Sequence, residues 1–302
     1  MSSAAMTVAL RPYRALMRDY LVLSKARIVL MVLITAAAGY FFAADGADAF
    51  RLLNLLIGTA LLAGGTNALN QYVEREQDGK MERTRLRPLP AGRMTPRAAL
   101  IFSVMISIAG TAYLAATVNL LTAALGALTL ATYILIYTPM KRVSSWCTLI
   151  GAIPGAIPPL MGWTAAENAL GVGGWIAFAI LFLWQMPHFM AISWMYRQDY
   201  GRAGFSMLSV TDAEGIATAR QAVLYTVALF AATLVPVVLG MAGVVYAAGV
   251  TVAGLALFAA AVRFYADRSS RRAARLFIAS NLYLVVVMLL LVTAAVPHAP
   301  TA

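Results

Sequence analysis

The sequence predicts an all-α, polytopic membrane protein with nine transmembrane helices and a cytoplasmic N-terminus. Three observations lead to this fold class: the composition, the length of the apolar runs and the side on which the bases lie. Of the 302 residues, 62% are hydrophobic and only 12% are charged, and the mean hydropathy is +0.79. A soluble domain carries about 25% charged residues, so this composition excludes a soluble enzyme with a large core and favours membrane spans.

The individual helices are predicted from apolar runs long enough to cross a bilayer, which takes roughly 17–25 residues. In chain order these runs cover about 28–44, 52–72, 98–118, 120–138, 146–164, 172–194, 219–240, 243–264 and 274–296. The fifth run contains three prolines, which predict a kink whose freed carbonyls are satisfied by neighbouring helices. These prolines are Pro154, Pro158 and Pro159.

Helix ends have local signals of their own. Thr95 and Pro96 are suited to the N-cap and first position of the third helix, and Thr211 with Glu214 forms a T-x-x-E capping box before the seventh. We expect Asp212, within that box, to be structural as well. Three tryptophans near predicted helix ends are expected to anchor the membrane interfaces. They are Trp146, Trp163 and Trp175.

Basic residues gather on one side of the nine helices. The N-terminal segment and the connections after helices two, four, six and eight hold 22 of the 23 lysines and arginines, and only Arg51 lies on the other side. The positive-inside rule places these segments in the cytoplasm. The distribution also supports the helix count, because a missed or extra helix would mix the two sides. We expect one membrane domain over 1–302, with 1–20 as a cytoplasmic tail and no cleaved signal peptide.

Acidic residues are the feature that orientation does not explain. The segment 70–90, NQYVEREQDGKMERTRLRPLP, concentrates them on the basic side. Asn70, Glu74 and Asp78 follow one another at a spacing of four, which places them along one stripe of a helix. Carboxylate and amide oxygens bind hard cations such as Mg²⁺, and the bases that follow can bind phosphate. The pattern predicts a diphosphate site; the alternative is an orientation loop whose bases are balanced by surface acids.

A second acidic segment lies at the matching end of the sixth helix. In WQMPHFMAISWMYRQDYGRAGFSML, the charged residues Arg197, Asp199 and Arg202 stand beside Tyr196 and Tyr200. The two acid-bearing connections follow helices that are four helices apart. This spacing suggests two related halves that face one central cavity.

A resemblance to a known family rests on five stretches between about residues 21 and 210. They are NQYVEREQDGKMERTRLRPLPAGR, LSKARIVLMVLITAAAGY, YTPMKRVSSWCTLIGAIPGAIPPLMGW, MPHFMAISWMYRQDY and GRAGFSML. Together they resemble the haem branch of the intramembrane UbiA-type prenyltransferase superfamily. Membership implies a nine-helix bundle around a cavity open to the membrane, with Mg²⁺ as cofactor. It also implies farnesyl diphosphate as donor, haem B as acceptor, and haem O and diphosphate as products after addition of water.

The resemblance also implies roles for particular residues. The catalytic metal would be held by Asn70, Glu74, Asp78 and Asp199. Glu74 stands where the superfamily usually has Asp, and the second motif lacks the further acids that usually surround its first. The donor's diphosphate would be held by six bases, namely Lys80, Arg83, Arg87, Lys141, Arg142 and Arg197.

One histidine lies inside a predicted span. His188 stands in WQMPHF, eleven residues before Asp199, which places it roughly 16 Å deeper along the helix at 1.5 Å per residue. An ionisable residue at membrane depth indicates function by default. Three roles are open: it ligates the haem iron, contacts a propionate, or hydrogen-bonds a carbonyl freed by Pro187.

Two other functions account for part of the pattern. A prenyltransferase for an aromatic quinone precursor would share the metal site, but MPHF, DYxxAG and the E-x-x-x-D spacing stand against it. A transporter would carry functional charges near the midplane of discontinuous helices, whereas nearly all charges here lie at one face. The net charge of +11 follows from orientation, so we expect no nucleic-acid partner. We expect a bacterial inner membrane, with a mitochondrial one as the alternative, and a downstream haem A synthase or oxidase assembly factors as candidate partners.

Overall fold

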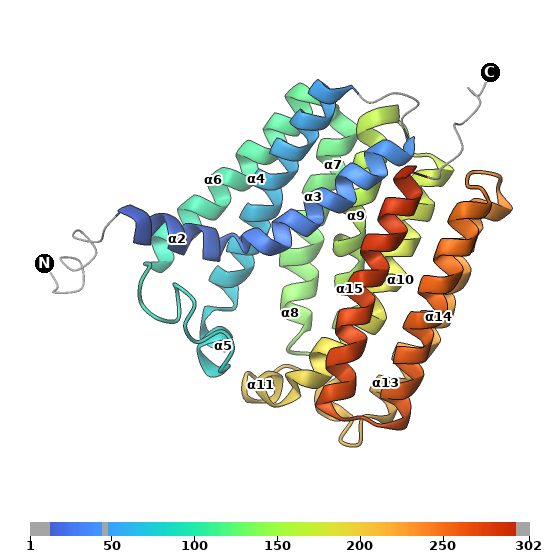
Figure 1. The fold of residues 1–302 in the computed structure, drawn as a ribbon. Coiled ribbons are helices and arrows are strands. Elements are labelled where there is room, and N and C mark those ends of the chain that lie inside the picture. Colours follow the sequence, from blue (N-terminus) through green and yellow to red (C-terminus); the bar gives the residue numbers. More distant parts are fainter. Residues whose placement is uncertain (1–12, 44–47, 294–302) are drawn as a thin grey trace, which may run out of the picture.

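The computed structural model describes residues 13–43 and 48–293, and within these ranges all assigned elements are helical (Figure 1). Nine helical stretches among the described residues are long and apolar enough to cross a membrane, which confirms the expected spans. They are α3 (Ala26–Ala43), α4 (Ala49–Val73), α6 (Pro96–Thr117), α7 to α8 (Leu120–Met140), α9 (Cys147–Glu167), α10 (Val172–Met195), α13 (Ile216–Val238), α14 (Val244–Ala266) and α15 (Ser270–Thr293). The expected ends at 44 and 294–296 lie outside the described residues.

Four short helices complete the described part of the chain. They are α2 (Tyr13–Leu23), α5 (Arg75–Lys80), α11 (Arg197–Arg202) and α12 (Leu208–Thr211). The first of them overlaps the expected N-terminal tail 1–20, whose described residues, 13–20, are helical. Asp19 of α2 is buried and pairs with Arg93 at 3.1 Å, and Gln71 donates to the last two carbonyls of α2 at 2.9 and 2.7 Å. This helix is therefore fastened to the bundle.

The expected cap of α6 is confirmed. The Thr95 hydroxyl accepts a hydrogen bond from the Ala98 N–H at 3.2 Å, and Pro96 occupies the first turn, where its missing N–H leaves no gap in the ladder. The prolines of α9 lie inside a helix that continues from Cys147 to Glu167. Their helix is buried along most of its length, so neighbouring helices surround it.

The expected capping box before α13 is wrong. Glu214 is exposed, and the residue that precedes the helix is Gly215, with φ at 75°. Asp212 supplies the cap instead: its carboxylate accepts the Thr218 N–H at 2.7 Å. The left-handed Gly215 turns the chain so that the carboxylate of Asp212 reaches the first turn of α13. Thr211 is instead the last residue of α12.

One of the three expected interfacial anchors is also wrong. Trp146 and Trp175 are exposed, as an anchor at the membrane surface must be, but Trp163 is only 7% exposed. The ring of Trp163 packs edge-on against Phe42 at 5.7 Å. A position near a helix end did not predict exposure of this side chain, because α3 and α10 cover this end of α9.

The two largest apolar clusters of the described residues lie between the long helices. One joins α3, α4, α6, α7 and α9, and the other joins α3, α9, α10, α13, α14 and α15. Helices α3 and α9 contribute to both, and they approach each other closely. A β-carbon on Gly39 would collide with the Pro159 carbonyl, and one on Gly162 would collide with the Ala36 carbonyl. Glycine at both places lets the two backbones touch.

The fourth span is not a plain α-helix. A π-helical segment, Thr132–Tyr137, separates α7 (Leu120–Ala131) from α8 (Thr138–Met140). Pro139 has no N–H to complete the α-helical ladder, so the turn before it is where the pattern changes. Such segments occur frequently at functional sites, and this one carries Tyr133 and Tyr137, whose rings are 5.0 Å apart.

Candidate functional site

The two acidic segments meet at one end of the bundle. Figure 1 shows α5 after α4 and α11 after α10 at the same end. Contact between them runs through Asp199 of α11, whose carboxylate oxygens accept the backbone N–H groups of Glu82 at 3.2 Å and Arg83 at 3.3 Å. Residues more than a hundred positions apart in the chain therefore build one site, as the matching helix ends suggested.

Asn70, Glu74 and Asp78 lie along one stripe although the helix is interrupted between them. Helix α4 ends at Val73, and Glu74 leaves helical geometry with φ at −90° and ψ at 12°. Backbone hydrogen bonds nevertheless continue from Glu74 to Asn70 at 2.9 Å and from Asp78 to Glu74 at 2.8 Å. All three are buried, at 1%, 6% and 1% exposed in chain order.

Each carboxylate of this stripe is paired with a base. Lys141 donates from Nζ to Glu74 Oε1 at 2.7 Å, and Arg87 donates from Nη1 to both oxygens of Asp78 at 2.8 and 2.7 Å. A buried carboxylate without a partner would be strongly destabilising, so these pairs explain how the stripe tolerates its depth. Two of the six predicted phosphate-binding bases are thus inside the site.

Asp199 has a different set of partners. Arg202, one turn along the same helix, pairs with it. Burial alone would raise the pKa of this carboxyl group, but the Arg202 hydrogen bond and the two backbone N–H groups lower it below its usual value. Asp199 is therefore held ionised, and its bonds fix the segment after α5.

The other predicted bases are distributed unevenly. Arg83 is exposed and lies over the rings of Tyr196 at 4.8 Å and Tyr200 at 5.8 Å. Arg197 folds back onto Trp194 at 4.1 Å and donates to its carbonyl. The remaining two are exposed, namely Lys80 and Arg142. Arg83 thus borders the site, while the structure does not bring Lys80 and Arg142 into it.

Lys25 is a site residue that the sequence analysis missed. Its Nζ donates to Asn70 Oδ1 at 2.8 Å. Burial, with repulsion from Arg87 and Lys141, lowers the pKa of this ammonium to about 7. Its sequence position marks Lys25 only as one of the bases of the N-terminal segment, although it lies in LSKAR, the start of one of the stretches that carry the family resemblance.

The π-helical span forms a wall of the same site. Asn70 donates from Nδ2 to the Thr138 hydroxyl at 3.3 Å, and Thr138 donates to the carbonyl of Tyr133 at 2.8 Å. The Lys141 ammonium lies over the ring of Tyr137 at 4.6 Å, a favourable cation–π contact. The amide of Asn70 is thus held from both sides, by Lys25 and by Thr138.

The donor set suits a hard divalent cation in kind. Four buried side chains with oxygen donors lie at this end of the bundle, which is the ligand chemistry of Mg²⁺. The ammonium of Lys25 is a cation already placed among three of them, since it bonds Asn70 and is attracted by Glu74 and Asp78. Within 13–43 and 48–293, however, no three His, Cys, Asp or Glu side chains are close enough to hold a metal. The carboxylates are turned toward their own bases.

His188 lies in the other half of the bundle, against α15. Its Nδ1 is 3.0 Å from the Ser280 hydroxyl, which itself donates to the Phe277 carbonyl at 2.8 Å. With the one proton of that hydroxyl assigned to the Phe277 carbonyl, Nδ1 is the donor to Ser280, and Nε2 then keeps the lone pair. The imidazole is flanked by the rings of Trp184 and Phe277, each at 4.7 Å. The partner of Nδ1 is therefore Ser280 and not the carbonyl freed by Pro187.

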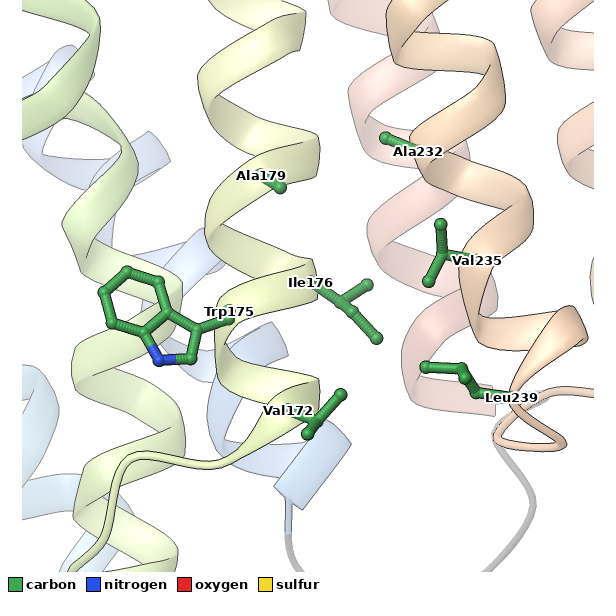
Figure 2. Close-up of a pocket in the computed structure, with 7 residues that line it drawn as sticks. All are labelled: Val172, Trp175, Ile176, Ala179, Ala232, Val235 and Leu239. Carbon is green, nitrogen blue, oxygen red and sulfur yellow. The ribbon is translucent and has the colours of Figure 1, made fainter.

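An apolar groove elsewhere on the bundle is not part of this site. It lies between α10 and α13 and has a volume of about 310 Å³ (Figure 2). The groove is lined by the first residues of α10, whereas the site lies at the other end of α10, where α11 follows. The side chains that line it carry no titratable group. They are Val172, Trp175, Ile176, Ala179, Ala232, Val235 and Leu239. A groove of this composition on a membrane span suits lipid chains rather than bond-breaking chemistry.

Comparison with known sequences gives a consistent result. Residues 32–295 match the model of the UbiA prenyltransferase family. Over 278 residues the chain is 49% identical to the protein named Protoheme IX farnesyltransferase of Solibacter usitatus (strain Ellin6076). That match covers 89% of this chain and 95% of the relative.

Comparison with solved structures supports the fold alone, because the identities are low. A structure of digeranylgeranylglyceryl phosphate synthase matches with a TM-score of 0.76 at 16% identity, covering 92% of this chain and 98% of that one. A UbiA homolog from Archaeoglobus fulgidus bound to GPP and Mg²⁺ matches with a TM-score of 0.57 at 14% identity, covering 91% and 100%.

Proposed function

The chain belongs to the UbiA prenyltransferase family, and from this premise we propose that it transfers the farnesyl group of farnesyl diphosphate to a vinyl group of haem B. Water adds in the same reaction, and the products are haem O and diphosphate. The observation that carries this proposal is the 49% identity, over 89% of the chain, to a relative named for protohaem farnesyl transfer. We further propose a bacterial inner membrane as its location and a haem A synthase as the consumer of its product.

The proposed metal ligands are Asn70, Glu74, Asp78 and Asp199. Their support is burial, donor chemistry and a common position at one end of the bundle. When bound, Mg²⁺ supplies positive charge that polarises the bond to the leaving diphosphate. The proposed partners of the diphosphate are the bases Arg83, Arg87 and Lys141, together with the more peripheral Lys80, Arg142 and Arg197.

The reaction needs no covalent nucleophile from the protein. The bond between the first farnesyl carbon and the diphosphate oxygen breaks, and the bases stabilise the charge that develops on that oxygen. A haem vinyl group forms the new carbon–carbon bond with the allylic cation. Water then captures the cation on the haem side chain and releases a proton. What the protein contributes is charge, orientation and an apolar site that excludes stray water.

His188 is the proposed contact of the haem. Its support is the hydrogen bond to Ser280, which leaves Nε2 as the nitrogen with a lone pair, and its position in a membrane span. Ser280 would orient the imidazole as a hydrogen-bond partner commonly does for a metal-bound histidine. Ligation of the haem iron through Nε2 is the role that this arrangement favours.

The test is pigment extraction from bacteria that express the chain together with a haem supply. Haem O should accumulate, and it should be absent when the Asp78→Asn variant is expressed at the same level. A prenylated aromatic product in place of haem O would show that the chain is a quinone-precursor prenyltransferase instead.

A further inference from the structure

Helix α2 is fastened to the bundle along one face. On this inner face Asp19 pairs with Arg93 at 3.1 Å, and Leu23 is fully buried. The ring of Tyr20 packs against Phe102 in the second turn of α6, with 4.6 Å between the ring centroids. Figure 1 shows α2 lying across the beginning of α6 rather than along the long helices. The helix therefore lies crosswise at the end of the bundle where the spans α3 and α6 begin.

The opposite, outer face of α2 carries two stripes of side chains. The apolar stripe consists of Tyr13, Met17 and Leu21, which are four residues apart and all exposed. The basic stripe consists of Arg14 and Arg18, which have the same spacing and are exposed as well. Successive residues of an α-helix lie about 100° apart around its axis, so the basic stripe borders the apolar one. Such a pair of stripes is typical of helices that lie in the interface of a membrane.

The basic stripe is available for an anion from outside the protein. Within residues 13–43 and 48–293, no carboxylate forms an ion pair with Arg14 or Arg18. Asp19, the acid of the same helix, turns to Arg93 on the inner face. Arginine binds phosphate through two parallel N–H groups, so two guanidinium groups one turn apart suit a phosphate group.

The spans next to α2 show that lipid reaches this part of the molecule. Ile28 and Leu30 in the first turns of α3 are exposed, and so are Ile101 and Met105 in the first turns of α6. Both helices are membrane spans, so these side chains face acyl chains. Because α2 leads into α3 and packs on α6, its outer face lies where the acyl chains meet the headgroups.

We propose that the outer face of α2 binds anionic phospholipid. The apolar stripe inserts among the acyl chains near the headgroups, and the basic stripe binds the headgroup phosphate, whose net negative charge it attracts. This interaction goes beyond the proposed farnesyl transfer and does not depend on it. Lipid on the outer face and the bundle on the inner face together fix α2, whose last two carbonyls are capped by Gln71, the neighbour of Asn70 in the candidate site.

The first measurement is the environment of the two sides of α2. A cysteine-reactive fluorophore is attached to Met17→Cys or to Val22→Cys in the full-length protein, in vesicles of phosphatidylcholine and phosphatidylglycerol. The native Cys147 is buried, so the reagent labels the introduced cysteine. Val22 is exposed too but lies about 140° round the helix from Met17, which makes it the matched control. The Met17 label should be quenched by spin-labelled lipid and not by aqueous iodide, and the Val22 label should show the reverse.

The second measurement is the choice of lipid at the outer face. Spin-labelled phosphatidylglycerol should quench the Met17 label as if it were enriched roughly fivefold over spin-labelled phosphatidylcholine, because bases at a membrane surface attract anionic lipids. Replacing both bases, Arg14→Gln with Arg18→Gln, should abolish the enrichment. The matched control is Arg271→Gln with Arg275→Gln, which removes two exposed bases at the same spacing from the start of α15 and should leave the enrichment unchanged.

Three results would overturn the proposal. Equal iodide quenching of the Met17 and Val22 labels would mean that the outer face lies in water. Shielding of the Met17 label from both iodide and spin-labelled lipid would mean that a protein partner covers it. An enrichment that is absent, or that survives loss of Arg14 and Arg18, would refute the recognition of anionic headgroups by the basic stripe.

Discussion

The two acidic segments of the site differ in what their carboxylates contact. In the first, Glu74 and Asp78 bind the side chains of Lys141 and Arg87, which a phosphate group could take over. In the second, Asp199 also pairs with a base, Arg202, but in addition it binds two backbone N–H groups of the segment after α5. The comparison teaches that carboxylates proposed for one metal site differ in their structural role, because only Asp199 also holds the backbone of another segment in place.

The largest expected effect is in the first segment. Asp78→Asn should lower turnover by on the order of 100-fold or more, because the leaving diphosphate loses its charge compensation while shape is retained. Haem O formation by the purified protein is the measurement, with the melting temperature as a check of folding. Glu76→Gln is the matched control, since Glu76 is an exposed acid two residues away. Near-normal activity of Asp78→Asn with Mg²⁺ present would reduce the stripe to surface charge.

The second segment should respond differently. Asp199→Ala should lower turnover by on the order of 100-fold, as expected for loss of a metal ligand, and, unlike Asp78→Asn, should also expose 81–94 to proteases. Limited proteolysis of the protein in liposomes measures the second effect. If turnover fell as far as in Asp78→Asn with no change in cleavage, the two segments would play the same role and the contrast between them would be wrong.

The bases should divide in the same way. Arg87→Ala and Arg83→Ala should raise the KM for farnesyl diphosphate by roughly tenfold or more, because a charge-assisted hydrogen bond contributes about 1.5–3 kcal/mol. The KM for haem should change much less. Arg75 lies off the stripe and over Tyr72, so Arg75→Ala should leave both values nearly unaltered. Equal effects of all three variants would indicate a general electrostatic role.

The smallest effect on the binding of farnesyl diphosphate is expected from changes at His188, which lies inside a membrane span. His188→Ala should change the absorption spectrum of bound haem and weaken its binding, while the affinity for farnesyl diphosphate stays the same. Ser280→Ala should produce a weaker version of the same spectral change, because it frees the imidazole to rotate. An unaltered spectrum and haem affinity in folded His188→Ala protein would exclude a haem contact and leave His188 as a link between α10 and α15.

The spans and the stripe were predictable because they depend on local patterns. Apolar length defines a membrane helix, and a spacing of four places Asn70 and Asp78 on one face whatever the rest of the chain does. The cap at Thr95 is local for the same reason. The position of the second acidic segment was predictable as well. It follows a span four helices after the one that precedes the first segment, so both segments were expected at the same end of the bundle.

The residues that sequence reasoning missed depend on contacts between distant segments. Lys25 counted as one more orientation charge, because nothing in its neighbourhood shows that its side chain reaches Asn70 on another helix. Trp163 was taken for an interfacial anchor, although α3 covers it. At the start of α13 the expected cap was Thr211, whereas the left-handed Gly215 places the carboxylate of Asp212 at the first turn of the helix.

The glycine contact between α3 and α9 makes the protein fragile to mutation at a place far from any chemistry. Gly39 and Gly162 each face a backbone carbonyl that cannot move aside as a side chain could. A single added methyl group would push α3 outward, and α3 begins beside Lys25. A screen of random variants for lost haem O formation should therefore recover these two glycines together with Asp78. These variants would lose function because the distance between α3 and α9 changes, so raising the metal or substrate concentration would not restore it.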